Sequence, residues 1–77
     1  MIEFTVYSRE ACHLCEDLLQ QLSSLQQVHG FRIREINVDS QPQLIEQYGS
    51  QVPVVLYGDQ QICHYFLDQA AVLACLK

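Results

Sequence analysis

Apolar residues recur every three or four positions in the segment that follows His13. Such spacing places them on one face of an α-helix. Gly30 follows the last of them and is a common helix terminator. We therefore expect a long amphipathic helix over residues 13–29. Its apolar positions are Leu14, Leu18, Leu22, Leu25 and Val28, with Leu19 widening the stripe.

Four shorter stretches carry the alternation and the β-forming residues that are typical of strands. The first covers residues 2–7 and the second covers residues 31–38, one on each side of the long helix. Residues 52–57 are almost wholly apolar, and Gly58-Asp59 then turns the chain. Residues 60–66 are expected to return as an antiparallel partner, which makes a β-hairpin.

The segment after residue 38 predicts a short helix. Ser40 is a plausible cap, Gln43 completes an S-x-x-Q capping box, and Pro42 is tolerated in the first turn. Gly49 is expected to end the helix. The side chains predicted to face inward are Leu44, Ile45 and Tyr48.

A last helix is predicted from Asp68, which can cap it, through Leu76. Its expected core contacts are Ala71, Val72 and Leu76. The resulting order is β-α-β-α-β-β-α, in which a right-handed crossover makes the first two strands a parallel pair and the hairpin extends the sheet. No linker or repeat interrupts it, so residues 1–77 are expected to form a single α/β domain.

Composition fits a small globular domain, because hydrophobic residues make up 49% and charged residues 17% of the 77 positions. Nine acidic residues against four basic ones give a formal net charge of −5. The basic residues, Arg9, Arg32, Arg34 and Lys77, form no stripe. Since phosphate binding depends on Lys and Arg, we expect neither nucleic acid nor a membrane as a partner. The expected oligomeric state is a monomer.

The first residues show neither a basic region nor a long apolar stretch, so the sequence predicts no signal peptide and a cytoplasmic location. No apolar run approaches the roughly 20 residues of a membrane span. Protein thiols are mostly reduced in the cytosol. The four cysteines are therefore expected to be catalytic, metal-binding or buried rather than a structural disulfide framework.

Cys12 and Cys15 form a C-x-x-C motif where the first strand gives way to the long helix. Free backbone N–H groups and the positive end of the helix dipole favour a thiolate at this place. Cys15 lies one helical turn further on, close enough to form a disulfide with Cys12. The position predicts that an exposed Cys12 attacks and that Cys15 resolves. A protonated His13 beside Cys12 would favour the thiolate further, and Leu14 belongs either to the core or to an apolar wall that faces the substrate.

Two other interpretations of the motif stay open. The first is a binding module with an inert dithiol, which would hold a partner along Val52–Pro53. The second is a metal or iron–sulfur carrier, although two cysteines supply only half of the ligands that zinc requires. Cys63 and Cys75 lack a C-x-x-C partner, and we expect them to be small buried apolar residues.

The strand, the run V-Y-S-R-E-A-C-H-L-C, the helix and the later V-P-V entering a hairpin together resemble the glutaredoxin branch of the thioredoxin fold. The similarity is greatest to small bacterial glutaredoxin-like proteins with C-H-L-C. It covers nearly the whole chain and implies a thioredoxin-like, glutaredoxin-type fold, with a four-stranded mixed sheet flanked by three helices.

The resemblance also implies roles for residues outside the C-x-x-C motif. Pro53 would be cis and face the cysteines, and the backbone of Val52 would pair with a substrate. Arg9 stands where glutaredoxins often carry a basic residue that binds a glutathione carboxylate or stabilises the thiolate. The chain departs from the family's usual C-P-Y-C at His13-Leu14, and residues 61–66 lack its Gly-Gly and acidic pair.

Together these observations predict a thiol–disulfide oxidoreductase that uses Cys12 and Cys15, with Arg9, His13, Val52 and Pro53 at the substrate. The expected partners are a protein or low-molecular-weight disulfide and a cellular thiol reductant. No bound cofactor or metal is expected, and glutathione is a candidate electron donor.

Overall fold

A computed structural model describes residues 2–77, and its elements follow the predicted order. The strands are β1 (Glu3–Ser8), β2 (Arg32–Asn37), β3 (Val54–Tyr57) and β4 (Gln60–His64). The helices are α1 (His13–His29), α2 (Pro42–Tyr48) and α3 (Gln69–Cys75), with a short 3₁₀ turn, η1 (Val38–Ser40), before α2. No helix in this part of the chain is long and apolar enough to cross a membrane.

The four strands form one mixed sheet in the order β2-β1-β3-β4. β1 and β2 are parallel, whereas β3 runs antiparallel to both β1 and β4. The helix α1 connects the parallel pair, as a strand–helix–strand unit requires. The prediction of a thioredoxin-like α/β fold with a four-stranded mixed sheet and three helices is therefore confirmed.

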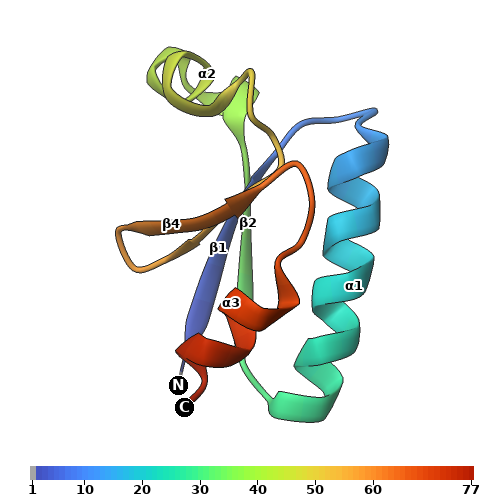
Figure 1. Ribbon diagram of the computed structural model, residues 1–77. Helices are drawn as coiled ribbons and strands as arrows, with labels where there is room; N and C mark the ends of the chain where they lie inside the picture. The colour runs from blue at the N-terminus through green and yellow to red at the C-terminus, as the bar shows by residue number, and fades with distance from the viewer. Residues whose placement is uncertain (1) are drawn as a thin grey trace.

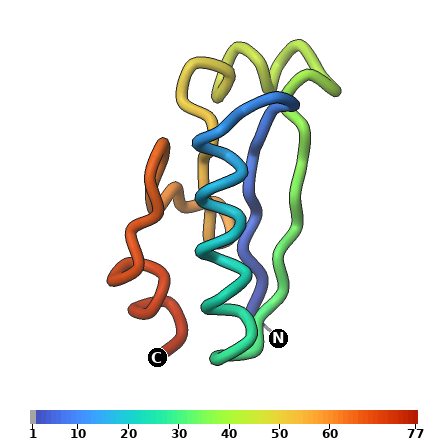
Figure 2. Tube along the Cα trace, turned by 90° about the vertical axis from the view of Figure 1, so that its right-hand side faces the viewer, coloured from blue at the N-terminus to red at the C-terminus, as the bar shows by residue number. Residues whose placement is uncertain are grey.

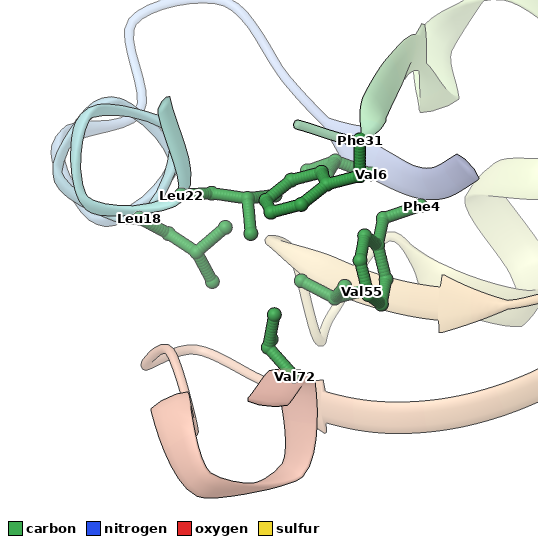
Figure 3. Close-up of a cluster of buried hydrophobic side chains, with 7 residues drawn as sticks. All are labelled: Phe4, Val6, Leu18, Leu22, Phe31, Val55 and Val72. Atoms are coloured by element: carbon green, nitrogen blue, oxygen red, sulfur yellow. The ribbon is translucent and has the colours of Figure 1, made fainter. Parts of the chain in front are cut away.

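The core lies between the sheet, α1 and α3, as Figure 3 shows. Alternate residues of β1 point into it, and the rings of Phe4 and Phe31 meet edge to face with their centroids 4.9 Å apart. The helix α1 supplies Leu18 and Leu22, and α3 supplies Val72. The buried cluster is completed by Val6 and Val55.

Figures 1 and 2 show that different elements lie at the two ends of the sheet. The N-terminal end of α1, the helix α2 and the segment that leads into β3 gather at one end of the sheet. The start of β1, the helix α3 and the C-terminal end of α1 lie at the other end. The first of these ends therefore carries the candidate chemistry.

The apolar stripe of α1 is narrower than predicted. Leu18 and Leu22 are buried, but Leu14 is 36% exposed and Val28 is 76% exposed. Each residue turns a helix by about 100°, so both residues have rotated away from the face that Leu18 and Leu22 define. Cys15 takes the inward position in the first turn and is 2% exposed.

The predicted start of α2 is wrong. Ser40 belongs to η1, and α2 begins at Pro42 with Gln41 as an N-cap that makes no side-chain hydrogen bond. The Asn37 side chain accepts from the Asp39 N–H and caps η1, which begins at Val38. Ser40 is therefore the last residue of η1 and does not cap α2.

The side chains of α2 that were predicted to face inward are only partly buried. None of its residues is buried, although Leu44 and Tyr48 are half-buried. Ile45 is 42% exposed. A helix of two turns at the end of a sheet covers too little of that sheet to bury a full stripe of its own.

The hairpin strands are shorter than predicted, whereas the last helix begins as expected. β3 starts at Val54, after the Val52–Pro53 bond, and β4 ends at His64 because Tyr65 has a positive φ of 62°. The Asp68 carboxylate accepts from the Ala71 N–H at 3.1 Å and caps α3.

Candidate functional site

Cys12 is the N-cap of α1, with extended backbone angles, and Cys15 follows one turn later. The two cysteines form a disulfide, and their Cα atoms are 5.2 Å apart. Ala11 just before them has a positive φ of 54°, a conformation that non-glycine residues seldom adopt and that turns the chain sharply into the helix. The strand-to-helix turn thus presents the pair at one end of the sheet.

The two cysteines have unequal environments. Cys15 is 2% exposed, whereas Cys12 is only half-buried. The Cys15 backbone N–H donates to the Cys12 Sγ at 3.2 Å, and the Glu16 N–H donates to the Cys12 carbonyl at 3.0 Å. Cys12 therefore caps the helix with its own sulfur atom and remains the accessible member of the pair.

The other side chains at the start of α1 are exposed, and two of them are acidic. His13 begins the helix directly beside Cys12, and Glu16 and Asp17 follow Cys15. Acidic groups in a first turn complement the helix dipole, but they also place negative charge near the sulfur atoms. His13 is the one histidine next to the pair.

The Val52–Pro53 bond is cis, as the family resemblance implies. Pro53 is buried and Val52 is half-buried. The Pro53 carbonyl accepts from the Tyr65 N–H at 2.8 Å, and the Tyr65 hydroxyl donates to the Ser50 carbonyl at 2.7 Å. Tyr65, just after β4, thus holds the segment that leads into β3 at two points.

Arg9 binds groups on the α2 side of the molecule. Its Nε and Nη2 lie 3.3 and 3.2 Å from the Asp39 carboxylate oxygens, and its Nη1 donates to the Gly49 carbonyl at 3.3 Å. All three guanidinium nitrogens therefore have partners within the protein. The predicted contact of Arg9 with a substrate carboxylate or with the thiolate stays a prediction.

A groove that the sequence analysis did not predict lies along the first turns of α1. It measures about 120 Å³ and is formed by one side of α1 and by the segment after β4. Leu14, the residue before Cys15, lines it on the α1 side, and Phe66, 70% exposed, lines it on the other side. The remaining lining residues are Asp17, Leu18, Gln21, Tyr65 and Leu67. Sequence spacing alone gave no signal for it, since residues 60–66 were expected to continue as a strand.

Cys63 and Cys75 pack against the edge of the core and are half-buried, rather than fully buried as predicted. Burial raises the pKa of the Cys63 thiol; a hydrogen bond from the Asp68 backbone lowers it in part, and the Asp68 carboxylate raises it. Within residues 2–77, no three His, Cys, Asp or Glu side chains are grouped so as to hold a metal ion.

A family model described as "Glutaredoxin-like domain (DUF836)" matches residues 3–77. The chain belongs to this glutaredoxin-like family. A search among curated proteins finds no match.

Solved structures agree with this assignment. Protein Ne2328 from Nitrosomonas europaea is 38% identical with a TM-score of 0.88, and the alignment covers 99% of this chain and 92% of that one. Protein XcR50 from X. campestris is 27% identical with a TM-score of 0.69, over 95% of this chain and 93% of that one. A buckwheat glutaredoxin in complex with glutathione is similar in fold alone, at 20% identity and a TM-score of 0.53, over 95% and 66% of the two chains.

In this glutaredoxin-like domain the predicted site residues fall into two groups. Cys12, His13 and Cys15 belong to the start of α1, and Val52 and Pro53 belong to the segment before β3. These two segments lie at the same end of the molecule (Figures 1 and 2). Arg9 lies at this end too, but its bonds join it to Asp39 and Gly49. The sequence did not point to Tyr65, which is bonded to Pro53 and Ser50 and lines the groove together with Leu14.

Proposed function

We propose that this glutaredoxin-like protein is a thiol–disulfide oxidoreductase whose Cys12 and Cys15 exchange with the disulfide of a protein or a small molecule. Cys12 attacks in the proposed mechanism and Cys15 resolves. Val52 and Pro53 form a wall for the substrate, and His13 lies next to Cys12 at the substrate.

The observation that carries this proposal is the N-cap position of the half-exposed Cys12. Its sulfur already accepts the Cys15 N–H at 3.2 Å. After reduction the same donor and the helix dipole would stabilise a thiolate at that atom. Cys15 is 2% exposed, so a substrate disulfide can approach only Cys12.

The bonds and electrons of this exchange balance between the two cysteines and the substrate disulfide. The Cys12 thiolate attacks one sulfur of the substrate disulfide, forms a mixed disulfide and expels the other sulfur as a thiolate, which takes up a proton. Cys15 loses its proton and attacks Cys12, releasing the first substrate sulfur as a thiol and leaving the Cys12–Cys15 disulfide. Two electrons have then passed from the protein to the substrate, and a cellular thiol, with glutathione as one candidate, returns them.

Cysteine variants test the two roles separately. We expect Cys12→Ser to abolish the reduction of disulfides, whereas Cys15→Ser traps a mixed disulfide that mass spectrometry detects at Cys12. Cys63→Ser is the matched control, because Cys63 lies on the edge strand β4 and takes no part in the exchange. Full reductase activity in Cys12→Ser would refute the assignment.

The midpoint potential of the pair gives an independent test. In a series of thiol-to-disulfide buffers, Cys12 and Cys15 should interconvert between roughly −270 and −120 mV, the range of dithiol oxidoreductases. A pair that closes only below about −300 mV would behave as a structural disulfide and would favour the binding module.

A further inference from the structure

The groove is lined by neighbours of both groups of candidate site residues. Leu14, one of its walls, stands between Cys12 and Cys15 in the chain. Tyr65, on the other side, donates its backbone N–H to the Pro53 carbonyl. A substrate whose disulfide reaches Cys12 would therefore place its neighbouring residues close to this groove.

The lining of the groove suits an apolar side chain. Phe66 is 70% exposed, Tyr65 is 38% exposed and Leu14 is 36% exposed, although each of them is large and apolar. The volume of about 120 Å³ approaches the roughly 150 Å³ of a protein cavity that binds benzene. One aliphatic or aromatic side chain would bury the exposed parts of these residues and remove them from water.

The charges around the groove disfavour an anionic occupant. Asp17 is the one charged residue among the described residues that line it, and Glu16 stands beside it on the helix surface. The nearest arginine in the sequence, Arg9, has all three nitrogens bonded to Asp39 and Gly49. Glutathione carries more carboxylates than ammonium groups, and this groove offers no free cation to bind them.

We propose that this groove receives an apolar side chain next to a disulfide cysteine of a protein substrate, with a basic residue of that substrate facing Asp17. The inference rests on the proposed function, since it names the class of disulfide on which the Cys12–Cys15 pair acts. Disulfides in apolar, basic segments are reduced preferentially, and glutathione disulfide is a poor substrate. The covalent step is the exchange described above, so the substrate gains two electrons from the reduced pair, one proton from Cys15 and one proton from water.

Single-turnover kinetics with the reduced full-length protein, freed of reductant, test the preference. Cyclic disulfide peptides that differ only in the residues beside one cysteine, Leu-Lys, Ser-Lys or Leu-Glu, are compared with glutathione disulfide and 2-hydroxyethyl disulfide. Acid quenching and alkylation measure the loss of the dithiol. Each rate constant is divided by that of dithiothreitol with the same disulfide, which removes differences in intrinsic reactivity.

We expect the Leu-Lys peptide to react about tenfold faster than the Ser-Lys peptide, the effect of placing a small aliphatic side chain in an apolar site. It should react roughly threefold faster than the Leu-Glu peptide at low salt, and this advantage should shrink as salt screens Asp17. Glutathione disulfide should react no faster than 2-hydroxyethyl disulfide.

Three variants test whether the groove causes these differences in rate between the peptides. Phe66→Ala should bring the Leu-to-Ser ratio towards one, and Asp17→Lys should reverse the Lys-to-Glu preference. Val28→Ala is the matched control and should leave every ratio unchanged, because Val28 is an exposed apolar residue of the same helix outside the groove.

The outcomes separate this inference from the proposed function. Equal normalised rates for the Leu-Lys and Ser-Lys peptides, or a glutathione disulfide rate equal to that of the Leu-Lys peptide, would overturn the inference alone. A reduced protein that reacts with no disulfide, 2-hydroxyethyl disulfide included, would overturn the proposed function and this inference with it.

Discussion

The helices α1 and α2 stand on either side of the candidate site and are held in different ways. The seventeen residues of α1 bury Cys15, Leu18 and Leu22, and the helix is capped at both ends. The seven residues of α2 bury no side chain and lack a side-chain cap. Hydrophobic burial therefore positions α1 and its cysteines, whereas surface contacts position α2.

The surface contacts of α2 reach it from several elements. The rings of Tyr7 on β1 and Tyr48 on α2 stack with their centroids 4.4 Å apart. Arg9 binds the Gly49 carbonyl, and Tyr65 binds the Ser50 carbonyl. Such contacts contribute about 1 kcal/mol each, less than the burial of a large core side chain such as Leu22.

Truncation of the α1 core should produce the largest loss of stability. Leu22→Ala removes a fully buried side chain and should lower the free energy of unfolding by about 2–5 kcal/mol. Chemical denaturation measures it. Val28→Ala in the same helix and Leu44→Ala in α2 should each cost well under half as much, because those side chains are at most half-buried. Equal losses at Leu22 and Leu44 would contradict the distinction between the two helices.

Gly49→Ala should affect α2 next most strongly. A Cβ atom there would lie 2.5 Å from the Ile45 carbonyl oxygen and 3.2 Å from Arg9 Nη2. The backbone angles of Gly49 are right-handed helical, so the cost comes from crowding alone. We expect a loss of about 1–3 kcal/mol in unfolding free energy.

Ser50→Ala is the control for Gly49→Ala, because Ser50 is exposed and keeps its backbone carbonyl. It should change the unfolding free energy by less than about 0.5 kcal/mol. A Gly49→Ala protein as stable as Ser50→Ala would show that α2 shifts freely.

Tyr65→Phe should have a smaller and local effect. It removes the hydroxyl that donates to the Ser50 carbonyl and should cost about 0.5–1.5 kcal/mol. Hydrogen exchange at the Tyr65 amide, which is bonded to the Pro53 carbonyl, should become faster. Tyr57→Phe is the matched control, since both tyrosines are 38% exposed. Unchanged exchange in Tyr65→Phe would show that the hydroxyl does not hold the segment.

The smallest effect should be the pH dependence of stability that arises from Cys63, which packs against the edge of the core. Because its pKa is raised in the folded protein, the folded state retains this proton over a range in which the unfolded chain loses it. Stability from this group is complete below the usual thiol pKa of about 8.5 and falls as the pH rises above it. Denaturation of the wild type and of Cys63→Val between pH 6 and 10 should therefore show a steeper decline in the wild type above that value. Parallel curves would contradict the shift.

Much of the fold was predictable because it follows from local patterns. The stripe around Leu18 and Leu22 predicted α1, and Asp68 predicted the start of α3. The Ser40 cap failed because Asn37 starts the 3₁₀ turn earlier, a competition between neighbouring side chains that spacing cannot rank. Residues 65 and 66 were expected in a strand, and nothing in the sequence indicates the left-handed backbone of Tyr65.

Periodicity and the C-x-x-C spacing act over a few residues, and they were enough to predict the elements, their order and the place of Cys12 and Cys15 at a helix N-terminus. The tertiary structure alone decided what surrounds that pair. It bonded Arg9 to Asp39 and Gly49, and it set Phe66 opposite Leu14 across a groove. Contacts between residues some thirty to fifty positions apart depend on how β1, α1 and β4 pack together, and no local pattern carries that information.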